Sequence, residues 1–227
     1  MGFDSGPSCN VSLPADRSDN PAPAQQPVNR VHRQIRLRRL LKAFVQAAFL
    51  VAAFPAAALA GFGRWEKPYG VFANASALVP GILGDYFRIS FYKWTLAECS
   101  LSSRIQFGSF FAHPAARLGP HVYIGAYCIL GNVIIGEGSQ VASGVQVVSG
   151  RHQHLRDHLG RISGSEDGIF APVVIGAHCW IGAGAIVMED VGARSTIGAG
   201  SVVCRPIPPA SVAVGSPAKV IGSSAAV

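Results

Sequence analysis

Residues 175–203 read IGAHCWIGAGAIVMEDVGARSTIGAGSVV, and this stretch decides the fold. An aliphatic residue recurs in it, mostly at steps of six positions and often followed by glycine. These aliphatic positions are Ile175, Ile181, Val187, Val191, Ile197 and Val203. A period of six matches neither the roughly 3.6 residues of a helical turn nor the alternation of a half-buried strand. The stretch therefore predicts neither amphipathic helices nor ordinary alternating strands.

The same period runs upstream, before an interruption. Its aliphatic positions there are Leu118, Ile124, Leu130, Ile135, Val141 and Val147. We expect each short strand to form one side of a prism, with its aliphatic residue pointing to the axis and its small neighbour permitting the corner. Three such strands would complete a coil, and the stacked coils would share a continuous core, as in other solenoids.

Three segments of this region resemble a known family: CWIGAGAIV at 179–187, STIGAGSVV at 195–203 and RPIPPASVAVGSPAKVIG at 205–222. They are similar to the hexapeptide-repeat acyltransferases, which include sugar and exopolysaccharide O-acetyltransferases. The resemblance implies a mainly β fold, a left-handed parallel β-helix, over residues 101–222, with a C-terminal tail at 223–227. It also implies a homotrimer with the substrate cleft between subunits.

The interruption at residues 149–172 carries the expected catalytic chemistry. This excursion loop reads SGRHQHLRDHLGRISGSEDGIFAP. Transfer of an acetyl group from a thioester to a hydroxyl needs a base, and imidazole suits that task near neutral pH. The resemblance places the base at His152, with His154 as the alternative, and His158 is expected to be solvated. The family transfers the acetyl group directly, in a ternary complex.

The resemblance also implies a site for acetyl-CoA in the groove between adjacent β-helices. Ala183 and Ala199 match positions where small residues let backbone amides approach the pantetheine arm. Cys204, Arg205 and Lys219 match positions that flank the arm and the nucleotide phosphates. The two cationic side chains suit a phosphate-rich cofactor. Cys204 stands where threonine is commoner in the family.

The sequence predicts no metal site and no disulfide framework. Its five cysteines are odd in number, widely spaced and never in CxxC pairs. They are Cys9, Cys99, Cys128, Cys179 and Cys204. A related β-helix family, the γ-class carbonic anhydrases, binds zinc through three histidines, but the spacing of the loop histidines fits that pattern poorly.

The net charge of +7 is concentrated near the N-terminus. Residues 1–42 hold seven basic and three acidic side chains, which gives +4, and residues 43–227 hold twelve and nine, which gives +3. The body is close to neutral and has no basic stripe with interleaved aromatic residues, which argues against a nucleic-acid partner. Residues 1–29, rich in Pro, Ser, Asn and Ala, are expected to form a disordered tail.

Residues 30–100 are expected to form a basic and hydrophobic helical region that associates with a membrane. The 21 residues between Lys42 and Arg64 carry no charge, and about 20 apolar residues can span a bilayer core. A secretory signal peptide is disfavoured by its long polar leader. A single span would place everything after Arg64 outside the cytoplasm. A re-entrant or interfacial anchor, kinked at Pro55, would keep the body on the cytoplasmic face, where acetyl-CoA is found, and it is favoured over the single span.

Aromatic and basic residues are interleaved through residues 64–100. Such a mixture suits a lipid headgroup interface, and it equally suits a helical cap packed on the body. The aromatic members are Trp65, Tyr69, Phe72, Tyr86, Phe87, Phe91, Tyr92 and Trp94, and the basic members are Arg64, Lys67, Arg88 and Lys93. The two interpretations are compatible.

These features predict an acetyl-CoA-dependent O-acetyltransferase at a membrane surface. Its acceptor would be a sugar hydroxyl of an exopolysaccharide or of its lipid-linked precursor. One alternative is a xenobiotic O-acetyltransferase, which has no evident use for a membrane segment. Another is a catalytically silent trimeric scaffold within a polysaccharide-synthesis complex.

Overall fold

The computed structural model describes residues 28–148, 161 and 171–224, with side chains in the first helix described from Leu40 onward. The chain divides into two units, Met1–Leu41 and Lys42–Val227. The first unit contributes the N-terminal part of helix α1 (Val28–Leu59). The second unit contains the rest of α1, the other helices and all the described strands.

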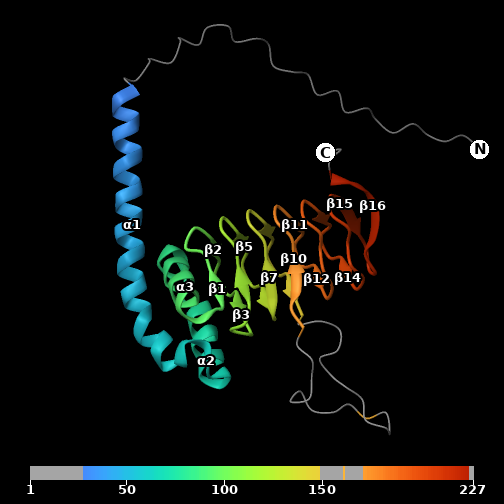
Figure 1. Cartoon of the computed structure of the whole chain (residues 1–227), viewed down its shortest axis with the longest axis horizontal. Helices are drawn as coiled ribbons and strands as arrows, with labels where there is room; N and C mark the ends of the chain where they lie inside the picture. The colour runs from blue at the N-terminus through green and yellow to red at the C-terminus, as the bar shows by residue number, and fades with distance from the viewer. Residues whose placement is uncertain (1–27, 149–160, 162–170, 225–227) are drawn as a thin grey trace, which may run out of the picture. The chain divides into compact units, whose positions relative to one another are not determined.

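Short strands wind around three faces, and each face is a sheet (Figure 1). Sheet A contains β1 (Glu98–Cys99), β4 (Arg117–Leu118), β7 (Val133–Ile135) and β10 (Val173–Ile175). Sheet B contains β2 (Arg104–Ile105), β5 (Tyr123–Ile124), β8 (Gln140–Val141), β11 (Trp180–Ile181), β13 (Thr196–Ile197), β15 (Ser211–Val214) and β16 (Lys219–Ser223). Sheet C contains β3 (Phe110–Phe111), β6 (Ile129–Leu130), β9 (Gln146–Val147), β12 (Ile186–Val187) and β14 (Val202–Val203). The chain visits the sheets in the order A, B, C, so the strands of successive coils pair in parallel.

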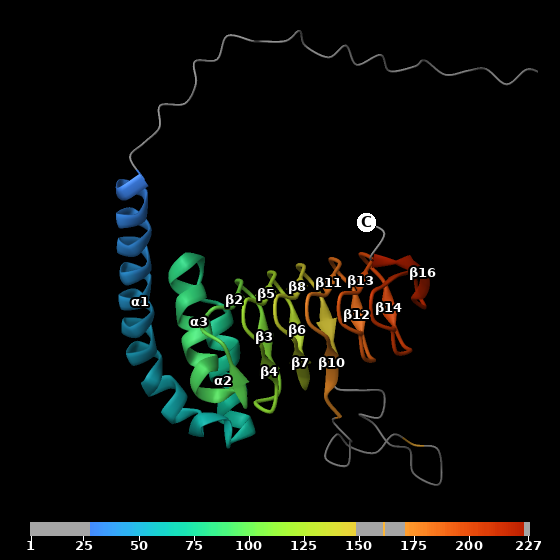
Figure 2. The ribbon, with the colours of Figure 1, turned by 45° about the horizontal axis from the view of Figure 1, so that its top comes forward.

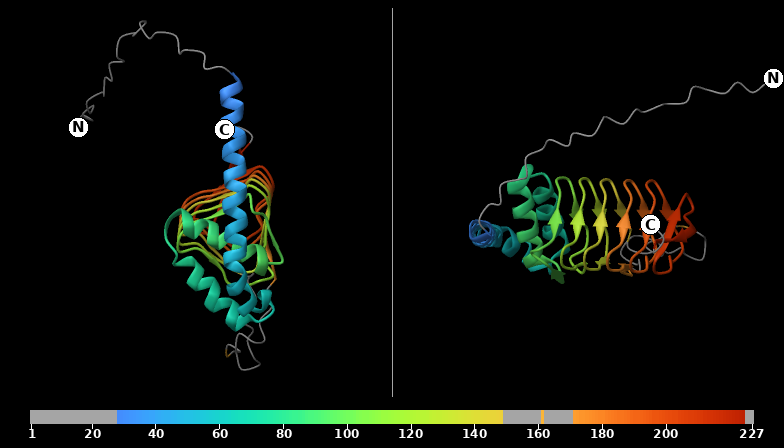
Figure 3. Two further views of the ribbon diagram at one scale, coloured as in Figure 1. Left: turned by 90° about the vertical axis from the view of Figure 1, so that its left-hand side faces the viewer. Right: turned by 90° about the horizontal axis from the view of Figure 1, so that it is seen from above.

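The three sheets surround a common core (Figure 3), and the predicted aliphatic positions belong to it. All twelve are buried, with at most 2% of each residue exposed. The predicted solenoid of parallel strands is therefore confirmed. It also extends one coil further toward the N-terminus than the aliphatic period indicates, because Cys99, Ile105 and Phe111 occupy the corresponding core positions and are buried.

The corners between sheets require small residues. A Cβ added to Gly176 would lie 2.4 Å from the backbone nitrogen of Ala193 on the next coil, and one added to Gly182 would lie 2.4 Å from that of Ala199. Some corner positions also need a left-handed backbone, as at Gly184 with φ of +67°, which glycine adopts at little cost. Glycine after an aliphatic residue thus sets how closely the coils can stack.

Helices α2 (Glu66–Ala77) and α3 (Gly81–Thr95) pack on the first coil of the solenoid, and the short 3-10 helix η1 (Gly61–Gly63) precedes them (Figure 2). The Tyr69 hydroxyl donates to the carbonyl of Phe111 at 3.0 Å, and the N–H of Phe111 donates to the Tyr92 hydroxyl at 3.1 Å. Burial raises the pKa of both tyrosines, which keeps their hydroxyls protonated. Residues 64–100 therefore do form a helical cap on the body.

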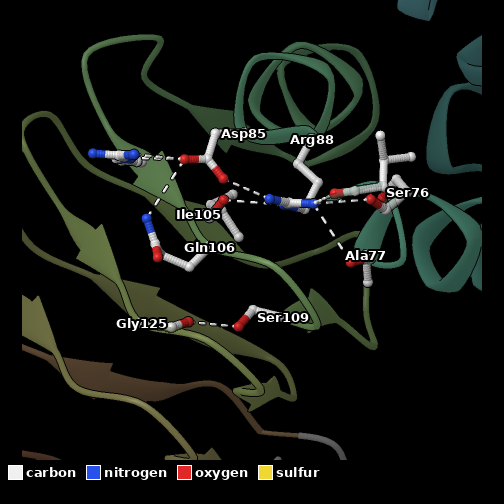
Figure 4. Close-up of polar contacts among 10 residues, drawn as sticks. Ser76, Ala77, Asp85, Arg88, Ile105, Gln106, Ser109 and Gly125 are labelled. Atoms are coloured by element: carbon white, nitrogen blue, oxygen red, sulfur yellow. Dashed lines mark hydrogen bonds and ion pairs between the residues drawn. The ribbon is translucent and has the colours of Figure 1, made fainter. Parts of the chain in front are cut away.

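A fully buried arginine fixes this cap to the first coil (Figure 4). The Arg88 guanidinium donates to the carbonyls of Ile105 at 3.0 Å and Val79 at 2.6 Å, and it pairs with the Asp85 carboxylate at 2.6 Å. Burial lowers the pKa of Arg88, and the neighbouring Asp85 opposes that shift. The other carboxylate oxygen of Asp85 pairs with Arg104 at 2.8 Å. The interpretation of Arg88 as a headgroup contact is wrong, because its bonds are satisfied inside the protein.

The apolar part of α1 packs against α3. Ala53 and Ala57 are fully buried, and the Trp94 indole N–H donates to the carbonyl of Leu50 at 3.1 Å. Leu40–Leu59 is the one stretch of helix, among the described residues, that is long and apolar enough to cross a membrane. Only 17% of its most apolar window is buried.

The close stacking of coils predicts opposite effects of one substitution at two glycines. Gly176→Ala should lower the free energy of unfolding by about 1–3 kcal/mol, because the new methyl group overpacks the coil interface. Gly70→Ala should raise it by about 0.5–1 kcal/mol, because Gly70 lies inside α2 with nothing within 4 Å of an added Cβ. Urea unfolding followed by circular dichroism measures both values, and equal effects at the two sites would contradict the packing argument.

The Arg88 network predicts that two arginine substitutions differ in their effect on the free energy of unfolding. Arg88→Leu should lower the free energy of unfolding by about 3–5 kcal/mol, because it leaves buried carbonyls without a donor and Asp85 without its buried partner. The matched variant Arg104→Gln should cost under about 1 kcal/mol, since the Arg104 side chain is 55% exposed. The same urea titration compares the two, and a smaller loss for Arg88→Leu would show that this network does not hold the cap.

Candidate functional site

Two of the residues expected to bind acetyl-CoA lie at the corner where sheet B turns into sheet C. Ala183 stands between β11 and β12, and Ala199 stands between β13 and β14. The two corners stack on each other, because the N–H of Gly200 donates to the carbonyl of Ala183 at 2.8 Å. Both alanines are exposed. The structure therefore brings them together on neighbouring coils, at the edge of sheet C that the N-terminal ends of its strands form.

These corners present backbone donors to solvent. Within the residues that the structure describes, the N–H groups of Ala183 and Ala199 donate no hydrogen bond to the protein. The glycines that follow them, Gly184 and Gly200, would have nothing within 4 Å of an added Cβ, so the space outside these two glycines is open, whereas the Ala199 nitrogen lies close to Gly182 of the preceding coil. Each backbone N–H is an obligatory donor. An extended ligand that carries carbonyl groups could accept from both.

The remaining predicted residues surround the last strand of sheet C. Cys204, which is half-buried, and Arg205, which is exposed, follow β14 directly at the opposite edge of the sheet. Lys219 is exposed at the start of β16. The residue before it, Ala218, donates its N–H to the carbonyl of Val202 in β14 at 2.8 Å. All five residues therefore lie around β12 and β14, with two cationic side chains among them.

The excursion loop leaves the solenoid at the same edge of sheet C as Cys204. Strand β9 pairs with β12, and the N–H of Val148, the residue after β9, donates to the carbonyl of Val187 at 3.0 Å. The predicted base His152 and the other loop histidines, His154 and His158, lie outside the described residues. Sheet C thus has the amides of Ala183 and Ala199 at one edge, and the histidine-bearing loop starts at the other edge.

The described cysteines in the core are not candidate nucleophiles. Cys99, Cys128 and Cys179 are free thiols and buried. Burial raises the pKa of the Cys99 thiol to about 12 and also raises the pKa of Cys128 and Cys179. A thiol held in its neutral form is a poor nucleophile and a poor metal ligand. No group of three or more metal-ligating side chains occurs among residues 40–148, 161 and 171–224, whose side chains the structure describes.

A family model described as bacterial transferase hexapeptide (six repeats) matches residues 172–205. The match covers β10 to β14, the strands that carry Ala183 and Ala199. The resemblance of the chain to hexapeptide-repeat transferases is therefore confirmed.

Two named relatives each match about half of this chain. Nodulation protein L of Rhizobium meliloti (strain 1021) is 43% identical over 110 residues, which cover 46% of this chain and 58% of that protein. A serine acetyltransferase of Mycobacterium tuberculosis is 40% identical over 124 residues, 49% of this chain and 45% of that protein. The chain thus spans about half the length of the curated relatives it matches.

Two solved structures share the fold over 70% of this chain. A maltose O-acetyltransferase from Clostridium difficile 630 superposes with a TM-score of 0.53 at 24% identity and over 86% of its own chain. A hexapeptide-repeat containing acetyltransferase from Vibrio cholerae superposes with a TM-score of 0.51 at 22% identity and over 92% of its own chain. At these identities the likeness concerns the fold.

Sequence reasoning missed a pocket in the cap region, away from sheet C, with both polar and apolar residues in its lining. It has a volume of about 230 Å³, and its lining includes Lys42, Gln46, Asp85, Tyr86, Ser103 and Arg104. No motif marks it, because α1, α3 and the first coil each contribute only a few residues. Trp180 is 60% exposed on sheet B.

Proposed function

We propose that the protein is an acetyl-CoA-dependent O-acetyltransferase that acts on a sugar hydroxyl of an exopolysaccharide or of its lipid-linked precursor. The observation that carries the proposal is the pair of open backbone amides at Ala183 and Ala199. They flank sheet C, as do Arg205 and the start of the histidine-bearing loop, and Lys219 lies beside β14 at the start of β16. Acetyl-CoA requires amides that can hydrogen-bond its pantetheine arm and cations that can bind its phosphates.

The comparisons support the class of reaction. The solved structures of similar fold are described as a maltose O-acetyltransferase and an acetyltransferase, and a further structure of the Vibrio cholerae protein is described as a complex with acetyl coenzyme A. The sugar in the name of the first favours a sugar acceptor for this chain. Relatives above 40% identity are named for nodulation, and that name identifies no acceptor.

In the proposed mechanism a histidine of the excursion loop is the general base. His152 would take the proton of the acceptor hydroxyl as its oxygen attacks the thioester carbonyl, and would return that proton to the departing thiolate. His154 is the alternative base. The amides of Ala183 and Ala199 would hold the pantetheine arm, while Arg205 and Lys219 would bind the phosphates. No cysteine or serine nucleophile is required.

The exposed position of these residues supports an active homotrimer. One chain supplies only an open surface at the edge of sheet C, since Ala183 and Ala199 are both exposed there. A second subunit packed beside this edge would close the surface into a cleft and exclude water from the thioester. The apolar helix α1 would hold the assembly on the cytoplasmic face of a membrane, where acetyl-CoA is available.

The mechanism predicts a large loss of turnover on removal of the base. His152→Ala should lower kcat for acetyl transfer by about 10²–10⁴-fold, the usual scale of general-base catalysis. The matched variant His158→Ala should stay within about threefold of the unsubstituted protein. Release of free thiol from acetyl-CoA in the presence of cell-surface polysaccharide measures both. Unchanged turnover in His152→Ala would transfer the role to His154, and absence of acetyl transfer by the unsubstituted protein would favour a scaffold.

The cofactor site predicts a separate effect on binding. Arg205→Ala and Lys219→Ala should each raise the Kd for acetyl-CoA by about fivefold to tenfold, the loss of one charge-assisted contact. Arg194→Ala removes an exposed cation from a corner between sheets A and B and should leave the Kd unchanged. Isothermal titration calorimetry measures the three values. An equal loss of affinity for acetyl-CoA in Arg194→Ala and Arg205→Ala would indicate a nonspecific charge effect.

A further inference from the structure

The outward side of α1 is an uninterrupted apolar surface. Phe44 is 74% exposed, Val51 75% and Leu59 64%, and helical geometry places these three residues on the side opposite the buried Ala53 and Ala57. We call the outward residues Phe44, Val51 and Leu59, with the exposed alanines Ala47, Ala48 and Ala52, the outer stripe. Soluble helices normally turn such a face inward.

The polar residues of the same helix are turned toward the protein. Between positions 42 and 59 the only polar or charged side chains are Lys42 and Gln46. Both line the pocket that also contains Asp85 and Arg104, and the Gln46 amide donates to the Ser90 hydroxyl at 2.9 Å. The polarity of α1 is therefore inverted relative to a helix that faces water.

An aromatic cluster lies beside the outer stripe, toward the C-terminal end of α1. Phe54 packs against Phe62 and Trp94 with ring centroids 5.6 and 5.5 Å apart, and all three rings are partly exposed. Amphipathic aromatic rings prefer the headgroup level of a membrane.

The inner side of α1 is already occupied. Phe49 stacks on Tyr86 at 5.6 Å, and Ala53 and Ala57 are buried against the cap. The cap is in turn fixed to the solenoid through Arg88. A transmembrane helix has lipid or other spans on all sides, and these contacts would have to break before α1 could cross a bilayer.

We infer that α1 lies in the plane of one leaflet, with the outer stripe in the acyl-chain boundary and the cap on the water side. The partner is an anionic phospholipid surface, because basic residues concentrate in positions 30–42 just before the stripe. This inference deepens the membrane location in the proposed function, but it requires no acetyl transfer.

Vesicle binding tests the surface directly, with the full chain and phosphatidylcholine vesicles that contain about 30% phosphatidylglycerol. Val51→Glu should lower the vesicle-bound to free ratio by at least about tenfold, because it places a charge in the apolar boundary. Gln140→Glu adds the same charge on the exposed face of sheet B and should change the ratio less than about twofold. Val51→Ser, without a charge, should give an intermediate loss. Equal binding by Val51→Glu and the unsubstituted chain would overturn the inference.

A depth measurement separates the in-plane helix from a span. Single cysteines at Phe44, Val51 and Leu59, in a Cys9→Ser and Cys204→Ser background, carry a fluorophore that brominated lipids quench. The in-plane helix predicts equal depths for all three. A span predicts that Phe44 and Leu59 differ in depth by about 22 Å, with Val51 at the centre. If instead Val51→Glu lowers the oligomer mass in solution and leaves vesicle binding intact, a second copy of the chain covers the stripe and the inference fails.

Discussion

The close approach of one coil's corner to the backbone of the next is the constraint on which the structure depends. At five corners an added Cβ would lie between 2.3 and 2.5 Å from a backbone nitrogen of the following coil. These corners are at Gly125, Gly136, Gly176, Gly182 and Gly192. A side chain there would force the coils apart, and both the parallel hydrogen bonds and the aliphatic column depend on that spacing. The glycines that follow the aliphatic residues therefore organise the core as much as the aliphatic residues do.

The same constraint creates the candidate site. Within the described part of the chain, the tight corners leave the amides of the exposed residues Ala183 and Ala199 without a protein acceptor, and the glycines that follow them leave room for a ligand. Because each coil bonds only to its neighbours, the excursion loop interrupts the chain without shifting the register. Val133 pairs with Val173 across the loop, just as Arg117 pairs with Ile134 on the adjacent coil. A loop that bears a base can thus be added to the solenoid without disturbing the corners at Ala183 and Ala199.

The sequence predicts the repeats well because they are local: aliphatic and small residues at a fixed spacing mark each coil. It does not predict the first coil, because Cys99 and Phe111 replace the usual aliphatic residues and no glycine follows them. The role of Arg88 was also missed. Its bonds reach α2 and β2, and one sequence does not show which basic residue meets them. The positions of Ala183 and Ala199 were predicted from the resemblance, while their open amides could be seen only in the stacked coils.

Hydrogen exchange of the corner amides tests the central claim most directly. The full chain is exchanged in deuterated buffer with and without acetyl-CoA, and site-resolved mass spectrometry follows the amides of Ala183 and Ala199. The account predicts that both exchange fast in the free protein and are slowed by acetyl-CoA, while the already bonded amides of Gly184 and Gly200 change little. If acetyl-CoA slows amide exchange elsewhere and leaves the exchange of Ala183 and Ala199 unchanged, the assignment of this edge of sheet C as the acyl-donor site is contradicted.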